Sequence, residues 1–141
     1  MKNDVYYLLD ILRERLDYPS LTMRVIDHAH RLLAHNVLIE DKGSGTELIQ
    51  DLRFGKTGIK PIDITPDVDK VTRMSNQSAQ IEAGRVIRPE TASWVEDFKA
   101  ELLTFPNGRF DDQVDSLSQF LSRAEYRRTF KFGTGRAIGW C

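Results

Sequence analysis

Hydrophobic and polar positions along the chain alternate between strand-like and helix-like patterns. Val5–Leu12 is rich in strand-favouring residues and is followed by charge, so it predicts a largely buried strand. Pro19 and Ser20 open a helix, which we expect to end at Asn36. The continuous apolar run Val37–Ile39 is typical of an interior parallel strand, because both faces of such a strand are covered.

The rest of the chain predicts shorter elements. We expect a helix over Thr46–Arg53 and a strand over Ile59–Ile64, where Pro61 indicates either an edge position or a break. A polar helix over Asp67–Ala83, anchored by Val68, Val71, Met74 and Ile81, and an extended piece at Val86–Pro89 should follow. The last two elements are a helix capped by Thr91 or Ser93, with Trp94, Phe98, Leu102 and Leu103 inward, and a helix over Asp111–Arg123. Strand–helix alternation of this kind indicates an α/β layer fold. We expect the strands at Val5–Leu12 and Val37–Glu40 to share one sheet, with the helix over Ser20–Asn36 packed on it.

Composition limits the classes of partner and compartment. The chain has 141 residues, with 20 Lys and Arg against 21 Asp and Glu, so any basic surface must be local. The single cysteine, Cys141, leaves no disulfide framework or cysteine metal site within the chain. No apolar run approaches the roughly 20 residues of a membrane helix. We therefore expect a cytoplasmic protein without a membrane partner.

An acidic pair follows the apolar strand. Glu40 and Asp41 come directly after Val37–Ile39, before a glycine-rich turn into a helix. In open α/β sheets ligands bind at the carboxyl ends of the strands, where a carboxylate can hold a divalent cation. The alternative is a solvated acidic turn.

A second acidic group crowds the start of the last predicted helix. At helical spacing Asp111 and Asp115 fall on one strip, while Asp112 points further out. The apolar stripe of this helix is formed by Val114, Leu117 and Leu121. A charged N-cap is the alternative reading, but three carboxylates exceed what capping needs, and their repulsion is relieved by a cation among them. The two acidic groups together predict a phosphodiesterase that uses two Mg²⁺ or Mn²⁺ ions.

Three segments resemble the C-terminal nuclease domain of phage terminase large subunits. They are Val37–Gly45 with Leu48–Leu52, Asp69–Arg73 with Ile81–Val86, and Phe105–Asp115, and the similarity extends from about Tyr6 to Leu121 in the family's order and spacing. The resemblance implies an RNase H-like mixed sheet with flanking helices, and a DNA endonuclease that cuts concatemeric DNA during genome packaging with two Mg²⁺ or Mn²⁺ ions. Its implied partners are double-stranded DNA and a portal or small terminase subunit, in the host cell cytoplasm.

The resemblance also assigns residues to roles. Glu40 would be the metal ligand of the second acidic strand, and Asp111, Asp112 and Asp115 would supply the last one. The helix geometry favours Asp111 and Asp115 as the direct metal ligands. Lys70 and Arg73 lie one turn apart and are candidates for contacts with DNA phosphates, with a solvated helix face as the alternative.

One departure from the family bears on activity. In the family, a first strand with an essential Asp precedes the strand that resembles Val5–Leu12, and only four residues stand before Val5 here. We therefore expect a partial nuclease domain, truncated at its N-terminus, over residues 1–122 and a basic, aromatic tail over residues 123–141. In the family the missing strand lies between the strands that correspond to Val5–Leu12 and Val37–Glu40, so we expect a gap, a direct abnormal pairing or a borrowed strand between these two. The alternative function is a non-catalytic prophage remnant that binds DNA or assembles with packaging proteins.

Overall fold

The computed structural model describes residues 4–129 and 137–140. The chain forms two compact units, Met1–Arg13 with Val68–Ser122, and Glu14–Asp67 with Arg123–Cys141. Both units are assembled from two separate stretches of sequence, so neither is a continuous segment.

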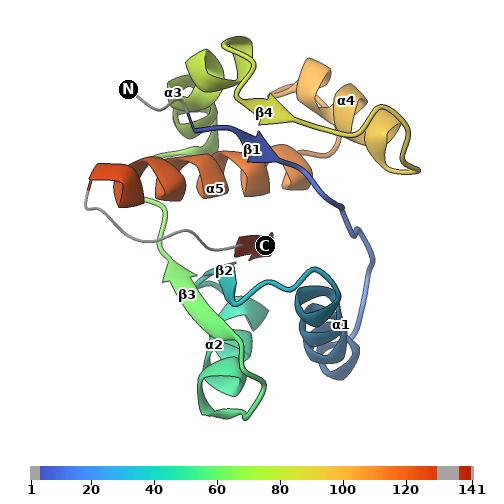
Figure 1. Ribbon diagram of the computed structural model, residues 1–141, viewed down its shortest axis with the longest axis vertical. Helices are drawn as coiled ribbons and strands as arrows, with labels where there is room; N and C mark the ends of the chain where they lie inside the picture. Colours follow the sequence, from blue (N-terminus) through green and yellow to red (C-terminus); the bar gives the residue numbers. More distant parts are fainter. Residues whose placement is uncertain (1–3, 130–136, 141) are drawn as a thin grey trace. The chain divides into compact units, whose positions relative to one another are not determined.

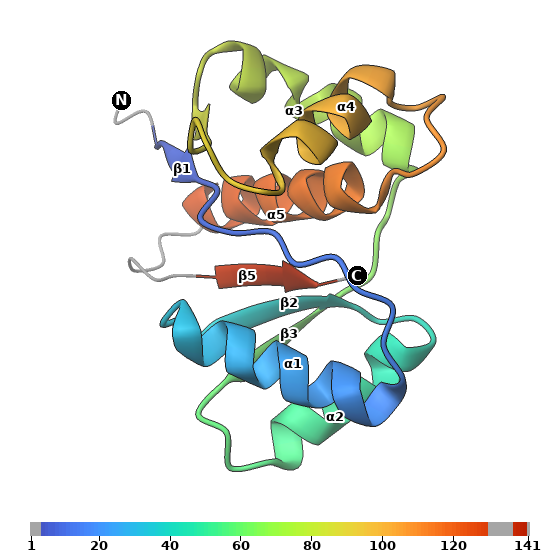
Figure 2. The ribbon, with the colours of Figure 1, turned by 90° about the vertical axis from the view of Figure 1, so that its right-hand side faces the viewer.

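The second unit is built on a parallel three-stranded sheet. Its strands are β2 (Asn36–Glu40), β3 (Lys60–Ile64) and β5 (Ala137–Trp140), in the order β3-β2-β5 (Figures 1 and 2). Pro61 lies opposite Val37 in β3. Proline has no amide to donate to a sheet, which suits an edge strand, and the edge position expected for this segment is confirmed.

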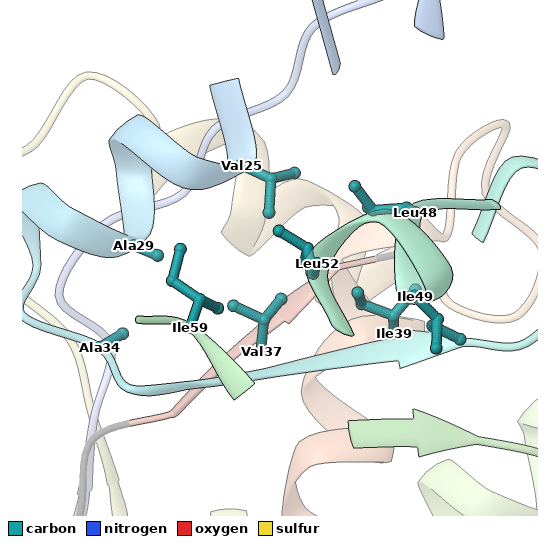
Figure 3. Close-up of a cluster of buried hydrophobic side chains, with 9 residues drawn as sticks. All are labelled: Val25, Ala29, Ala34, Val37, Ile39, Leu48, Ile49, Leu52 and Ile59. Carbon is teal, nitrogen blue, oxygen red and sulfur yellow. The ribbon is translucent and has the colours of Figure 1, made fainter. Parts of the chain in front are cut away.

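Two helices, α1 (Tyr18–Arg31) and α2 (Ser44–Phe54), pack on this sheet. Figure 3 shows Val37 and Ile39 of β2 pointing toward side chains from both helices. The buried cluster comprises Val25, Ala29, Ala34, Val37, Ile39, Leu48, Ile49, Leu52 and Ile59. The Asp17 carboxylate caps α1 by accepting the Ser20 amide at 2.9 Å. The helix ends at Arg31 rather than Asn36, because the chain turns at Leu33 with a φ of +54°.

The first unit is mainly helical. It contains α3 (Lys70–Glu82), α4 (Val95–Thr104), the start of α5 (Asp112–Thr129), and two short strands, β1 (Tyr6–Tyr7) and β4 (Val86–Ile87), paired in parallel (Figure 1). Its core cluster is Phe98, Leu117 and Leu121, with Tyr6, Leu8, Ile11, Ile81, Val86, Trp94, Leu102 and Phe120 packed against it. Val114, Leu117 and Leu121 are buried, which confirms the stripe expected for the last helix.

The expectation that Val5–Leu12 shares a sheet with Val37–Glu40 is wrong. Only Tyr6 and Tyr7 form a strand, and β1 pairs with β4 rather than β2. Tyr7 is 65% exposed and Leu9 56% exposed, so the segment buries one face instead of both. Its apolar content is high, but only Tyr6, Leu8 and Ile11 pack against the core, as in a strand lying at a surface.

In two helices of the first unit, Ile81, Trp94, Phe98 and Leu102 pack in or against the core as expected, but other residues differ from the expectation. In α3 the buried residues are Arg73 and Gln77, while Val71, and Val68 just before the helix, are exposed. In α4, Leu103 is 82% exposed and Glu101 is buried. Neither Thr91 nor Ser93 caps α4, whose N-cap residue is Trp94. Arg73, Gln77 and Glu101 can be buried because each forms hydrogen bonds with residues of α5.

The α/β class predicted from the sequence is confirmed. Beside β2, on the side away from β3, lies β5 from the other end of the chain (Figure 2). Because β1 is not in this sheet, the gap, abnormal pairing or borrowed strand expected between the two strands does not arise. Of the predicted basic and aromatic tail, Phe130, Lys131, Phe132 and Arg136 lie outside the described residues. Within the described part of the chain, no helix is both long enough and apolar enough to cross a membrane.

Candidate functional site

Glu40 is the last residue of β2 and is half-buried. The turn that follows brings the start of α2 close against it. A Cβ on Gly45 would overlap the Glu40 carbonyl oxygen, so this position accepts only glycine without a shift of the backbone. Gly43, at the N-cap of α2, has a φ of +57°, which favours glycine as well. The two glycines set how the chain leaves the strand at Glu40.

Asp41 is held within the same turn. Its carboxylate accepts a hydrogen bond from the Thr46 hydroxyl at 2.6 Å, and its amide donates to the Ile64 carbonyl at 2.9 Å. These contacts tie the turn to both α2 and β3. Asp41 therefore has a structural role in the turn.

Glu101 of α4 holds the start of α5 and was not singled out by sequence reasoning. Glu101 is 5% exposed, and its carboxylate accepts hydrogen bonds from the Gln113 amide at 2.6 Å, the Val114 amide at 3.0 Å and the Gln113 side-chain amide at 2.6 Å. These backbone amides are the second and third of the helix, the ones that an N-cap side chain usually satisfies. The capping acceptor for α5 thus comes from another helix.

Asp111 lies at the N-cap position of α5, but its carboxylate meets Lys70 of α3. The hydrogen bond to Asp111 raises the pKa of the Lys70 ammonium, and the charges of Asp111, Asp115 and Asp112 raise it further. Lys70 therefore stands in the combined field of all three carboxylates. Asp111 is therefore not the charged N-cap that was the alternative reading of this turn, because the backbone amides of Gln113 and Val114 donate to Glu101 instead.

Asp115 lies one turn further along α5 and meets the Arg73 guanidinium. Arg73 is 6% exposed, and it also donates to the Ser118 hydroxyl at 3.1 Å and the Val68 carbonyl at 3.0 Å. Gln119 approaches the second oxygen of Asp115 at 3.4 Å. Arg73 is thus buried between α3 and α5 rather than placed on a solvated face.

Asp112 is the most exposed carboxylate of the three. Its side chain is 72% exposed, with Arg13 at 4.0 Å. The Arg13 guanidinium also lies over the Phe110 ring, 4.2 Å from its centre. Each carboxylate of the acidic turn is therefore accompanied by a basic side chain, so its negative charge is balanced by a neighbour.

The structure brings Asp111, Asp112 and Asp115 together with Lys70 and Arg73 in the first unit, while Glu40 belongs to the second. Their carboxylate oxygens have the chemistry that Mg²⁺ and Mn²⁺ prefer. Among the described residues, no three His, Cys, Asp or Glu side chains are grouped closely enough to hold a metal ion. A direct approach of Glu40 to Asp111 or Asp115, at metal-bridging distance, stays a prediction.

Comparison with known proteins identifies the family. The family model described as the terminase RNase H-like domain matches residues 1–124, a range that covers most of the chain and includes both acidic segments. No curated protein and no solved structure gives a significant match. The match agrees with the resemblance carried by the three motifs. The chain belongs to the family of terminase RNase H-like domains.

Proposed function

We propose that this chain is a metal-dependent DNA endonuclease domain of the terminase type, which cuts concatemeric DNA during genome packaging. Family membership supports a nuclease-type role in a terminase. The observation that carries the proposal is the source of the α5 cap. Glu101 satisfies the Gln113 and Val114 amides, so the carboxylate of Asp111 is not needed for capping. Carboxylates that are not needed to cap their own helix are suited to bind a cation.

In this proposal Glu40 and the turn formed by Asp111, Asp112 and Asp115 supply the metal ligands. When bound, Mg²⁺ or Mn²⁺ would activate water and stabilise the attacking and leaving oxygens of a phosphodiester. The chain's own residues position the ligands. The Gly43–Gly45 turn sets Glu40, and Glu101 and Arg73 set the first turn of α5.

Terminase-family membership implies DNA and packaging proteins as partners in general. We propose double-stranded DNA as the substrate, a portal or small terminase subunit as the protein partner, and the host cytoplasm as the place of action. Of the two basic residues on α3, Lys70 has the more exposed side chain, 50% against 7% for Arg73. A phosphate contact in this region is therefore proposed for Lys70.

A second candidate function is a non-catalytic module that binds DNA or assembles with packaging proteins. The ion pairs favour it, because Lys70 and Arg73 neutralise Asp111 and Asp115 without a metal. In that case the only role of Asp111 and Asp115 would be to hold α3 against α5 through these ion pairs.

Nicking of supercoiled plasmid in Mn²⁺ separates the two functions. We expect weak or absent nicking by the 141-residue chain, and cleavage when a strand carrying the family's first Asp is fused ahead of Met1. Glu40→Gln and Asp111→Asn should each abolish that cleavage, whereas Asp97→Asn, at an exposed position of α4, should leave it unchanged. Cleavage that survives both substitutions would place the catalytic residues elsewhere. A fused protein that stays inactive while binding DNA would favour the second candidate.

A further inference from the structure

A groove borders β3, the edge strand of the sheet in the second unit. The part of α5 that belongs to this unit contributes Arg123 and Tyr126 to its lining. The volume of the groove is about 860 Å³, within the range of roughly 300–1,000 Å³ that is usual for ligand-binding clefts. Leu52 and Ile59 also line it, and both are buried members of the hydrophobic cluster of the unit. Part of the lining is therefore apolar and held in place by the core.

The charged residues of the lining leave an excess of positive charge. Arg53, Lys60 and Arg123 are basic, and Asp63 is acidic. Arg53 and Asp63 form an ion pair at 3.4 Å, with side chains 54% and 59% exposed, so these two charges balance each other. Lys60 and Arg123 remain, in a chain whose formal net charge is −1. A local excess of this kind, beside a hollow in the surface, attracts an anion.

Arg123 has a donor that the fold does not satisfy. Its Nε is buried, and within the part of the chain that the structure describes it is the one buried side-chain nitrogen or oxygen without a hydrogen-bond partner. The guanidinium carbon lies 5.5 Å from the centre of the Tyr126 ring, a contact that supplies no acceptor in the plane of the N–H groups. A buried donor without an acceptor is unfavourable. The oxygens of a bound phosphate are acceptors that a guanidinium matches well.

Tyr126 adds an aromatic surface to the same lining. The residue is 57% exposed, and it belongs to the basic, aromatic tail that the sequence predicts from residue 123. Basic side chains beside an exposed aromatic ring are the combination that holds unpaired nucleic acid, because the backbone is anionic and every base has a flat π face. In a duplex the bases stack on one another and cannot reach such a ring. Tyr126 therefore favours a single strand over a duplex.

The main chain of β3 is poorly suited to an added peptide strand, the other occupant that an edge strand could take. The Lys60 amide donates to the His35 carbonyl at 2.7 Å, and Pro61 has no amide hydrogen. Strand addition depends on main-chain hydrogen bonds along the open edge. The side chains of the groove, rather than the backbone of β3, therefore determine what it binds.

We propose that this groove binds a single-stranded segment of nucleic acid, with backbone phosphates on Lys60 and Arg123 and a base against Tyr126. The inference goes beyond the proposed nuclease function, since it concerns other residues and requires neither a metal ion nor the acidic turn of α5. The two cations supply affinity for any nucleic acid backbone. The aromatic ring supplies the preference for an unpaired strand.

Fluorescence anisotropy of the 141-residue chain with labelled oligothymidylate in EDTA tests this, because EDTA removes metal-dependent binding and cleavage. Oligothymidylate should bind more tightly than a DNA hairpin of the same length. Its affinity should fall as the salt concentration rises, since bound phosphates release counter-ions. Polyglutamate and inorganic phosphate, each at matched ionic strength, are competitors that stand for an acidic protein partner and for an isolated phosphate, and both should displace the oligonucleotide poorly.

Variants of the groove supply the second arm. Lys60→Gln and Arg123→Gln should each weaken binding and lower the slope of log affinity against log salt by about 0.7, the value for one phosphate contact on a single strand. Tyr126→Leu should weaken binding of oligothymidylate about fivefold or more with little effect on the hairpin, while Tyr126→Phe should bind as the parent does. Lys99→Gln, at an exposed lysine of α4 paired with Glu96, is the matched control and should change nothing. Thermal unfolding checks that each variant keeps the fold, and Lys60 is exposed, so its substitution should do so.

The outcomes separate this inference from the proposed nuclease function. The inference is overturned by a chain that binds no oligothymidylate, by a hairpin that binds as tightly, by equally effective displacement with polyglutamate or phosphate, or by binding that Lys60→Gln and Tyr126→Leu leave unchanged. If the fused protein cuts DNA through Glu40 and Asp111 but oligothymidylate does not bind, the groove fails and the nuclease function stands. If oligothymidylate binds through Lys60 and Tyr126 while the fused protein never cuts, the groove stands and the nuclease function fails.

Discussion

At the residue scale, Glu101 shows how a buried charge can organise a site without belonging to it. It lies in α4, twelve residues before Gln113, and its two oxygens serve the beginning of α5. A negative charge at the amino end of a helix is favourable, and bonds to a charged acceptor are stronger than neutral ones. The place of Asp111 relative to Lys70 depends on this support.

Glu101→Ala should destabilise the protein by about 3 kcal/mol, because the change leaves two buried amides without an acceptor. Glu101→Gln should destabilise the protein less, because the new side chain keeps one acceptor oxygen. Its NH₂ group would, however, face the side-chain NH₂ of Gln113, which is also a donor. Urea unfolding measures both. Glu96→Ala, at a position whose side chain is 81% exposed, should change stability by less than about 1 kcal/mol. Equal effects at positions 96 and 101 would contradict the capping role.

Asp69 allows a prediction with pH. The Thr72 amide, and then its hydroxyl, hold the pKa of this carboxyl below its ordinary 3.8. A lowered pKa means that the stabilisation is complete above 3.8 and is lost as the pH falls through the lowered value. The difference in melting temperature between the parent and Asp69→Ala should therefore be constant near neutral pH and shrink under acid conditions. A difference that grows under acid conditions would contradict this.

At the element scale, the turn from β2 into α2 determines the direction in which the chain leaves the sheet after Glu40. The strand end, the two glycines and the first turn of α2 act together, because a β-carbon at position 45 would overlap the Glu40 carbonyl oxygen. A helix can approach a strand this closely only where no side chain intervenes.

Gly45→Ala should destabilise the second unit by about 1–3 kcal/mol, since the new methyl group must push back the Glu40 backbone. Ser44→Ala, at the neighbouring exposed position, should have a much smaller effect. Thermal unfolding compares the two variants. If Gly45→Ala unfolds like the parent, the close contact between α2 and β2 is not as described.

At the scale of the whole molecule, the last described strand completes the sheet of the second unit. β5 pairs with β2 over Asn36–Ile39, while β3 covers the opposite edge. β2 contributes Val37 and Ile39 to the buried cluster. The interior strand therefore depends on residues distant in the sequence.

Truncation after Thr129 removes β5 and should speed amide hydrogen exchange in β2, because one edge of that strand loses its partner. We also expect more aggregation, as exposed strand edges pair with one another. Truncation after Trp140, which removes Cys141 alone, is the matched control. Unchanged exchange in β2 would mean that β5 does not stabilise this sheet.

The sequence by itself determined the elements whose pattern is local. Val37–Ile39 was predictable as an interior strand from its continuous apolar run, and the face of α2 from the spacing of Leu48, Ile49 and Leu52. Pro61 indicated an edge strand because it lacks an amide hydrogen. The order of the acidic motifs was enough to indicate the terminase family, which the family match confirms.

Only the tertiary structure decided which partner each segment meets. Val5–Leu12 has the composition of a buried strand, but the element it pairs with is β4, and composition does not specify a partner. Arg73 and Glu101 look like surface residues in the sequence, since burying them is favourable only when Asp115, Ser118 and the α5 amides are in reach. Glu101 shares the helical face of Phe98 and Leu102, the one sequence signal that could have indicated its burial. Long-range pairing of polar groups depends on where separate helices meet, and that geometry is a property of the folded chain.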